Sequence, residues 1–121
     1  MVSVNLKETT EKRQLIIGEV VYCDFGNPQG SKQAGRRPCI VLGNEKALKY
    51  SSVVTLVPLT SKLKPHIPVH IRIKTGISCP STALVEQMTC MPIDKIELTD
   101  GHISKDELNS LKIAIMMQLG I

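Results

Sequence analysis

Residues 16–42 read IIGEVVYCDFGNPQGSKQAGRRPCIVL, two apolar segments separated by a loop of turn-forming residues. Residues 16–24 are rich in β-branched side chains and have the length of a strand. Glycine, proline, asparagine and serine are dense from Gly26 to Gly35, which predicts a long loop. Residues 38–42 form a short continuous apolar run, typical of a strand buried on both faces. This stretch therefore predicts two strands joined by a glycine-rich loop.

The chain continues with further candidate strands. They are residues 52–59, 67–73 and 82–88, with 91–97 as a candidate for a short sixth strand. Pro58 marks the end or an edge of its strand, since proline cannot donate to a ladder. Glu86 and Gln87 are adjacent within the fifth strand, so we expect them to point to opposite faces, one of them inward and in need of a partner.

The hydrophobic period changes at the C-terminus. Ser104 with Glu107 forms a capping box, which predicts a helix from there to about Leu119, with Gly120 as its stop. Its apolar residues recur at helical spacing, so we expect it to pack on a sheet or against a second subunit. They are Leu108, Leu111, Ile115 and Leu119, with Ile113, Met116 and Met117 widening the stripe. Five or six strands and a terminal helix predict a mainly β, α+β fold, a small barrel or half-barrel.

The length and composition indicate a globular protein with one main domain. The chain has 121 residues, of which 42% are hydrophobic, enough for a core without disulfides or metals. We expect residues 1–16 to form a polar arm and residues 17–121 to form the domain. The first 14 residues lack the apolar segment of a signal peptide, and no apolar run is long enough to span a membrane. A cytoplasmic protein is expected.

Positive charge is concentrated in two segments. Residues 29–49 hold five cations and one acid, and residues 60–78 hold four cations and no acid. Together they carry +8 against a net charge of +4 for the chain, so the remainder carries −4. Such blocks indicate a polyanionic partner, either nucleic acid or an acidic protein segment, although solvated loops would carry the same charges. Only three aromatic residues are present, which argues against binding single strands on an aromatic platform.

The cysteines and histidines give no metal-binding pattern. Cys23, Cys39 and Cys90 lie in apolar runs and are expected to be buried, and no Cys or His pair has zinc spacing. His66 and His70 could project from one face of an extended segment, but a plain strand is the stronger interpretation. We expect no metal and no cofactor.

Two polar clusters are candidates for chemistry. In the loop of residues 30–38, the glycines allow backbone N–H groups to approach an anion, and Ser31, Lys32, Gln33 and Arg36 add donors and charge. Arg37 precedes Pro38, which favours an extended backbone at the strand start and fixes its guanidinium for a phosphate. The second cluster, Thr60, Ser61 and Lys62, follows the third strand and could hydrogen-bond a scissile phosphate. The alternative for the loop is a basic segment that only aids solubility. The alternative for the second cluster is that threonine and serine simply end the strand, as they commonly do.

Four blocks of sequence, in this order, resemble the MazF/PemK family of toxin endoribonucleases. They are Gly18-Glu19-Val20-Val21, residues 30–38 (GSKQAGRRP), Val57-Pro58-Leu59-Thr60-Ser61 and Leu84-Val85-Glu86-Gln87. The resemblance implies an SH3-like barrel of five to seven strands with a C-terminal helix, assembled as a homodimer. It also implies metal-independent cleavage of single-stranded RNA. An antitoxin with an acidic disordered tail would block the RNA groove, and operator DNA would be bound only through that antitoxin.

The resemblance also implies roles for individual residues. By motif, Arg37 and Thr60 match the family's catalytic pair. Ser31 and Gln33 match loop positions near the RNA, and Gln87 matches a strand glutamine close to the site. With the charged and hydroxyl neighbours, the expected RNA-binding residues are Ser31, Lys32, Gln33, Arg36, Ser61, Lys62 and Gln87.

Two departures from the family pattern leave the RNA recognition sequence open. Met88 follows Gln87 where many relatives have an arginine, and Glu97 stands near the place of a further arginine. A non-catalytic toxin of similar fold that inhibits a protein such as DNA gyrase is the alternative, but such toxins lack the Arg/Thr pair. A degenerate member that only binds RNA is a third hypothesis.

Overall fold

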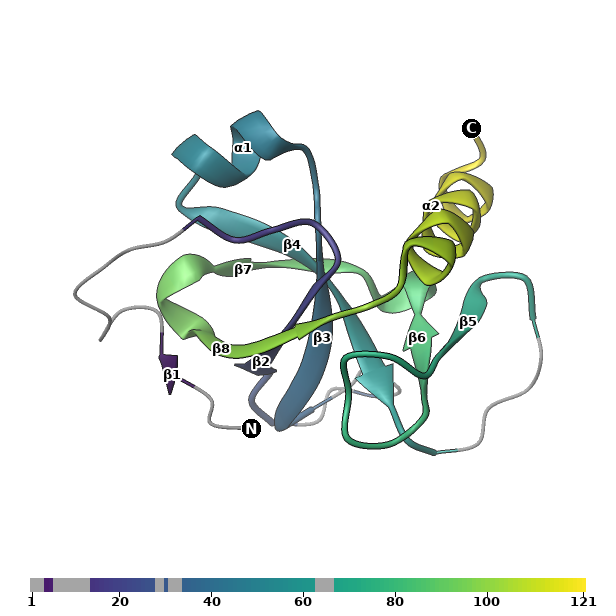
Figure 1. Ribbon diagram of the computed structural model, residues 1–121, viewed down its shortest axis with the longest axis horizontal. Coiled ribbons are helices and arrows are strands. Elements are labelled where there is room, and N and C mark those ends of the chain that lie inside the picture. Colours follow the sequence, from purple (N-terminus) through teal and green to yellow (C-terminus); the bar gives the residue numbers. More distant parts are fainter. Residues whose placement is uncertain (1–3, 6–13, 28–29, 31–33, 63–66) are drawn as a thin grey trace.

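The computed structural model describes residues 4–5, 14–27, 30, 34–62 and 67–121. Within these residues, eight strands, two α-helices and two short 3₁₀ helices follow one another (Figure 1). The strands are β1 (Val4–Asn5), β2 (Glu19–Asp24), β3 (Arg36–Leu42), β4 (Val53–Thr60), β5 (His70–Ile73), β6 (Ser81–Leu84), β7 (Thr89–Pro92) and β8 (Ile96–His102). The helices are α1 (Glu45–Tyr50), η2 (Val85–Gln87), η3 (Ile93–Lys95) and α2 (Lys105–Leu119).

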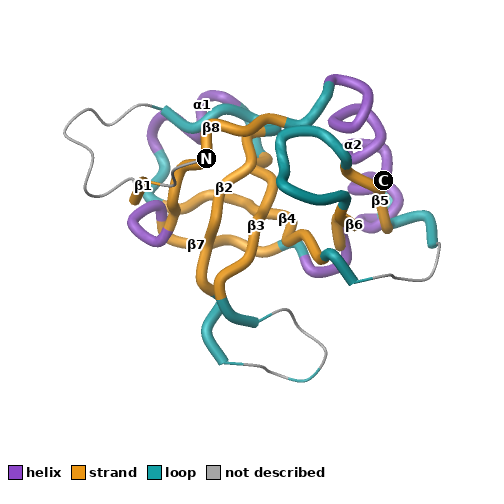
Figure 2. Tube along the Cα trace, turned by 60° about the horizontal axis from the view of Figure 1, so that its bottom comes forward, coloured by secondary structure: helices purple, strands orange, loops and turns teal. Residues whose placement is uncertain are grey.

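The strands form one antiparallel sheet in the order β1-β8-β2-β3-β4-β6-β5, with β7 added beside β4. Figure 2 shows β2, β3 and β4 side by side at its centre. The path from β7 through β4, β3 and β2 to β8 curls into a barrel-like unit. Among the described strands no pairing joins β7 to β8, so the unit is open there. The mainly β fold with a C-terminal helix is therefore confirmed, with β1 and the separate β7 and β8 raising the strand count to eight.

β4 links the barrel-like unit to a smaller extension. Its first half pairs with β7, from Val53 to Leu56, and its last two residues pair with β6 instead. β6 in turn pairs with β5. β4 is therefore shared by two partners along the same edge, and its end at Thr60 lies in the extension.

Two hydrophobic cores occupy the two faces of this sheet, because side chains alternate along each strand. The first lies inside the barrel-like unit and includes Val21, Cys39, Val41 and Leu56. The second includes Ile40, Val57, Leu59, Ile73, Ala83 and, from α2, Leu111 and Ala114. In Figure 1, α2 lies beside β5 and β6, on the right of the molecule. The second core is therefore the contact between α2 and the sheet.

The N-terminus of α2 is fixed by the predicted capping box. Ser104 Oγ accepts from the N–H of Glu107 at 3.1 Å, and the Glu107 carboxylate accepts from the N–H of Ser104 at 2.9 Å. The same carboxylate also accepts from the N–H of Lys74 at 2.6 Å and from the Thr75 hydroxyl. Gly120 ends the helix in the left-handed conformation, at φ 72°. The cap thus joins α2 to the segment after β5.

Several predicted boundaries were wrong. The first strand begins at Glu19 rather than residue 16, because the backbone turns at Gly18 with φ 89°. The segment predicted as a strand over residues 82–88 leaves the sheet after Leu84 and forms η2. Glu86 and Gln87 therefore lie on a 3₁₀ turn, and the expectation that they point to opposite faces of a strand was wrong.

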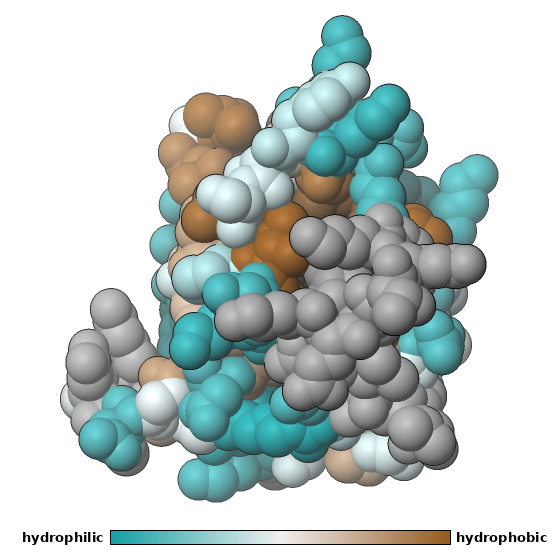
Figure 3. All heavy atoms as spheres, turned by 90° about the vertical axis from the view of Figure 1, so that its left-hand side faces the viewer, coloured by the Kyte–Doolittle hydropathy of each residue, from teal (hydrophilic) through white to brown (hydrophobic). Residues whose placement is uncertain are grey.

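The apolar stripe of α2 is narrower than predicted. Leu111 and Ala114 are buried, with Leu108 and Ile115 packed beside them. The remaining large apolar residues of the helix are exposed: Ile113, Met116, Met117 and Leu119. Ile16 and Val53 are exposed elsewhere, and Figure 3 shows apolar surface mixed with polar surface on the side of α1. No helix among the described residues is long and apolar enough to cross a membrane.

Candidate nucleic-acid interface

The start of β3 sends its two arginines to opposite faces of the sheet. Arg37 alternates with Cys39 on the face of the barrel core, whereas Arg36 and Pro38 alternate with Ile40 on the face of α2. The pairing with β2 supports this assignment, since Arg37 is opposite Cys23 of the barrel core and Pro38 is opposite Tyr22. β3 therefore contributes to two candidate surfaces, the first on the face of the barrel core with Arg37 and the second on the face of α2 with Arg36.

On the first surface, the strand register brings Arg37 toward Thr60. β3 and β4 are antiparallel, and their last recorded pair at this end is Cys39 with Pro58. The same register, continued for two residues, sets Arg37 opposite Thr60, and residues directly opposite in such a pair share a face. Arg37 Nε donates to the carbonyl of Ala34 at 2.9 Å, which ties the guanidinium stem to the preceding loop. A tied guanidinium beside a hydroxyl is an arrangement that can stabilise a phosphate.

Thr60 is almost fully buried, with 1% of its surface exposed. Its hydroxyl oxygen accepts from the N–H of Lys62 at 3.2 Å, which turns the chain sharply at the strand end. Accepting this bond leaves the hydroxyl proton available for donation. Lys62 and Ser61 are exposed just beyond it. Because Thr60 is buried, a substrate must come into close contact with the end of β4 to reach its hydroxyl.

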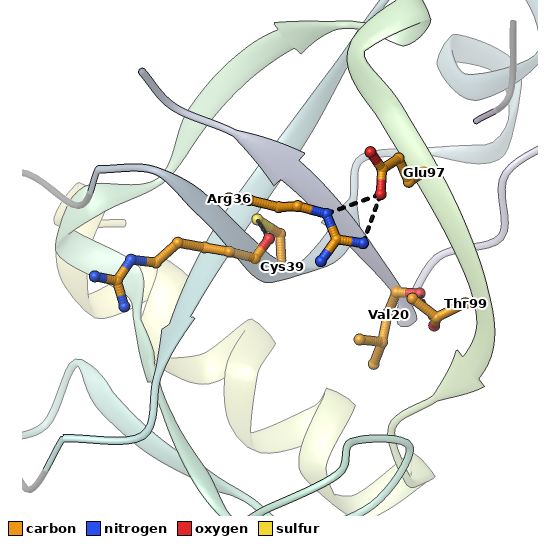
Figure 4. A network of polar contacts seen from close by, with 6 residues as sticks. Val20, Arg36, Cys39, Glu97 and Thr99 are labelled. Atoms are coloured by element: carbon orange, nitrogen blue, oxygen red, sulfur yellow. Dashed lines mark hydrogen bonds and ion pairs between the residues drawn. The ribbon is translucent and has the colours of Figure 1, made fainter. Parts of the chain in front are cut away.

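On the second surface, Arg36 is held by Glu97 and by the ring of Tyr22. Its Nη2 and Nε atoms lie 2.6 and 2.9 Å from Glu97 Oε2, and its guanidinium carbon lies 4.0 Å from the centre of the Tyr22 ring. In Figure 4 the side chain extends from β3 toward Glu97 on β8. The positive charge of Arg36 is thus balanced within the protein.

A cavity of about 630 Å³ opens beside Arg36. It is bordered by β2, β3, the end of β4 and the segment 76–81, including Tyr22, Arg36, Leu59, Ser61, Cys79 and Thr99. Arg37, between Arg36 and Pro38, borders it as well. A Cβ atom at Gly76 would collide with the backbone of His102, so glycine is needed for the segment 76–81 to approach β8 this closely.

The predicted RNA-binding residues do not form one cluster. Arg36, Arg37 and Ser61 border the cavity, whereas Thr60 is buried on the other face of the sheet. Gln87 lies at the end of η2, half-buried. Ser31, Lys32 and Gln33 lie outside the described residues. Tyr22, Glu97 and Thr99 were not predicted as part of a site. The signal for Glu97 was its departure from the family pattern, but its partner Arg36 is 61 residues away in sequence.

Two of the cysteines are buried and are not placed for catalysis. Burial, followed by the charge of Asp24, raises the pKa of Cys23 to about 11, and burial raises the pKa of Cys39 as well. Both are protonated near neutrality and unsuited to nucleophilic attack. Cys90 is exposed, so its predicted burial was wrong. It lies at the edge of the sheet, with Sγ 3.6 Å from Thr55 Oγ1.

His70 is engaged with a carboxylate. Its Nε2 lies 2.7 Å from Glu86 Oε2, which joins β5 to η2. His66 lies outside the described residues. Within the described part of the chain, no group of three or more His, Cys, Asp or Glu residues is placed to hold a metal ion.

Residues 17–119 match the model of a family described as PemK-like, MazF-like toxins of type II toxin–antitoxin systems. The chain belongs to this toxin family. An endoribonuclease MazF from Staphylococcus saprophyticus is 29% identical over 108 residues, which cover 86% of this chain and 90% of the relative. The predicted resemblance is confirmed, and so is the predicted class of toxin endoribonuclease at the level of the family.

Solved structures agree on the fold. MazF from Deinococcus radiodurans has a TM-score of 0.78 at 19% identity, with 90% of this chain and 99% of that chain covered. An endoribonuclease from a mycobacterial species, solved in complex with its cognate antitoxin, has a TM-score of 0.73 at 19% identity, covering 88% and 96% of the two chains. At these identities the neighbours establish the architecture of this toxin.

Proposed function

We propose that this toxin cleaves single-stranded RNA, such as mRNA, within short recognition sequences and without a metal ion. The ribose 2′-OH attacks the neighbouring phosphorus, the P–O5′ bond breaks, and the products carry a 2′,3′-cyclic phosphate and a 5′-OH. Arg37 and Thr60 are the proposed catalytic residues. The observation that carries the proposal is the β3–β4 register, which leads Arg37 toward Thr60 on one face in a chain of this family.

The chemistry suits these two side chains. Negative charge grows on the non-bridging phosphate oxygens as the 2′-oxygen attacks, and a fixed guanidinium and a hydroxyl donor stabilise that charge. The bond from Arg37 Nε to Ala34 supports a role in positioning, because it limits the motion of the guanidinium before substrate arrives. Ser61 and Lys62, exposed next to Thr60, are proposed to bind the RNA strand, as are Ser31, Lys32, Gln33, Arg36 and Gln87.

Arg37 is proposed to act electrostatically, with proton transfer through water or unusually perturbed groups, since a guanidinium is a poor base near neutrality. We therefore expect the cleavage rate to change little between about pH 6 and 8. A pH–rate profile measured on a short RNA checks this. A bell-shaped profile that disappears in His70→Ala would contradict the electrostatic role and make His70 the base.

Partner proteins are proposed on the same basis. An antitoxin with an acidic disordered tail would cover the basic segments, and a mycobacterial neighbour was solved in complex with its cognate antitoxin. Operator DNA would be bound only through that antitoxin, and the toxin would act in the cytoplasm. A homodimer is proposed, and the exposed Ile113, Met116 and Met117 of α2 are apolar surface suited to such a contact.

The test uses a long single-stranded RNA incubated with the purified toxin in EDTA. Discrete fragments ending in cyclic phosphate are expected from the wild type. Arg37→Ala and Thr60→Val should each lower the rate by about 10²–10³, the usual cost of losing one aimed donor. Thr60→Val keeps the shape of a buried side chain, and Lys112→Ala on exposed α2 surface is the matched control. Intact RNA after incubation with the wild type would overturn the proposal.

A further inference from the structure

A row of four polar residues crosses the sheet at the Thr60 end of β4. Thr60 is directly opposite Thr82 of β6, and Thr82 is directly opposite Arg72 of β5. Arg37 joins the row from β3 by the continued register described above. The order across the sheet is Arg37, Thr60, Thr82, Arg72, which we call the arginine–threonine row.

All four residues share the face that α2 does not cover. Their neighbours along the strands, Leu59, Ala83 and Ile71, pack in the second core beneath α2. Side chains alternate between faces, so the row projects to the opposite side. Arg72 is exposed, whereas Thr82 and Thr60 are buried. The row therefore places an accessible guanidinium on the same face as the proposed catalytic pair.

The guanidinium of Arg72 is held in place rather than extended into solvent. Its Nη1 donates to Thr82 Oγ1 at 3.2 Å. Since Thr82 is directly opposite Thr60, this bond holds the guanidinium against the residue that lies between Arg72 and Thr60 in the row. Only one of its five N–H donors is used by this bond, and the others can reach a phosphate.

The charge of Arg72 is not balanced by a carboxylate within the described residues. Glu86, which follows β6 in η2, is engaged by His70. Arg36 differs on this point, because Glu97 neutralises it. An arginine that is fixed by a neutral partner keeps its full attraction for an anion.

We propose that Arg72 is an RNA-binding residue of this toxin, held by Thr82 to contact a phosphate next to the one at Arg37 and Thr60. The inference rests on the proposed RNA cleavage and extends its binding surface from β3 and β4 to β5. Arg72 positions the RNA strand and takes no part in the bond changes. Its loss should therefore act on substrate binding more than on the chemical step.

The experiment compares Arg72→Ala, Arg72→Lys and Thr82→Val with the wild type, measuring kcat, KM and the salt dependence of kcat/KM on a short single-stranded RNA. Arg72→Ala should raise KM about tenfold, the value of one charge-assisted hydrogen bond, with kcat changed less than twofold. The slope of log(kcat/KM) against log salt should become shallower by about 0.7, the value for one phosphate contact on a single strand. Arg72→Lys keeps the charge and should preserve the slope while raising KM by a smaller factor.

Thr82→Val removes the oxygen that holds Arg72 and should raise KM by less than Arg72→Ala does. Lys112→Ala, an exposed cation on α2, is the matched control and should change neither KM nor slope. Thermal unfolding identifies any variant that fails to fold, in which case Arg72→Gln replaces Arg72→Ala. A slope and KM unchanged in Arg72→Ala, or a loss confined to kcat, would overturn the proposal.

The two proposals can fail separately. If the wild type cleaves no RNA, the proposed function fails, and the role of Arg72 is then measured by anisotropy of the same labelled RNA bound to the wild type and the variants. A weaker and less salt-dependent complex in Arg72→Ala supports the inference in that case too. Equal binding by both proteins, or no binding by the wild type, overturns it.

Discussion

The two faces of the sheet around β3 and β4 handle positive charge in opposite ways. On the face of α2, Arg36 is paired with Glu97 and stacked on Tyr22, beside the cavity. On the other face, Arg37 and Arg72 are tied to a backbone carbonyl and a threonine hydroxyl, which leave their charge intact. The difference indicates that the charge of Arg36 is balanced before RNA arrives, whereas the charges of Arg37 and Arg72 are available to an anion at once. Four predictions test this division, from the largest expected effect to the smallest.

Leu111→Ala tests the face of α2. Leu111 is fully buried between α2 and the sheet. Removing its side chain should lower the free energy of unfolding by about 2–5 kcal/mol, as cavities in packed cores do. Denaturant unfolding measures the loss, and RNA cleavage by the folded fraction should be unchanged. Loss of activity in fully folded protein would show that the two faces are coupled.

Arg37→Ala and Arg36→Ala compare neighbouring arginines on opposite faces. We expect a fall of about 10²–10³ in cleavage rate for Arg37→Ala, from the loss of one aimed donor. Arg36→Ala should reduce the rate only a few-fold, because its charge is already balanced by Glu97. Initial rates on one RNA, at matched folded concentration, decide the comparison. Equal losses of cleavage rate in the two variants would mean that Arg36 breaks its ion pair with Glu97 when RNA binds.

Glu107→Gln tests the cap that fixes α2. Partial burial tends to raise the pKa of Glu107, but hydrogen bonds from Thr75 and from the N–H groups of Ser104 and Lys74 lower it overall, below the ordinary 4.5. The ionised form is therefore favoured by folding. Its contribution is complete above about pH 4.5 and is lost as the pH falls through the lower value of the folded state.

The substitution should cost about 1 kcal/mol at pH 7, the usual value of a helix cap. It should also reduce the loss of stability between pH 5 and 3, because glutamine does not titrate. Urea unfolding at several pH values measures both effects. A variant that loses as much stability on acidification as the wild type would assign the acid sensitivity to other carboxylates.

Glu97→Gln should remove the negative charge that pairs with Arg36 and leave the guanidinium able to bind a phosphate. The ion pair is partly exposed, so its loss should cost no more than about 1 kcal/mol of stability. RNA binding should tighten by a few-fold and become more salt-dependent. Anisotropy with labelled RNA, in parallel with Glu45→Gln on exposed α1, provides the measurement and its control. Unchanged affinity would mean that RNA does not approach the cavity.

Features that depend on local sequence were predicted correctly. The capping box at Ser104 and Glu107 and the stop at Gly120 define α2, because caps use residues within one helical turn. α1 was not predicted, although Asn44 caps it by accepting from the N–H of Ala47. Its six residues are too few to show a hydrophobic period, and one buried residue, Leu48, holds it to the core.

The residues of the candidate site were predicted by motif, but their grouping was not. Arg36 and Arg37 are adjacent in sequence, and the prediction treated them as one basic loop. Alternation along β3 separates them, and it could not be applied before the start of the strand was known. Glu97, the partner of Arg36, lies 61 residues away in the sequence, beyond any local pattern. Thr82, the partner of Thr60, is on a different strand and was not predicted to be part of the site.

The sequence by itself determined the toxin family, the basic segments, the mainly β class of the fold and the cap of α2. These depend on residue type, composition and spacing over a few positions. Only the tertiary structure decided that Arg36 is neutralised by Glu97, and that Thr60, Thr82 and Arg72 stand in one row across three strands. Both results follow from strand register, which is set by cooperative packing of the whole sheet and determines which distant side chains share a face.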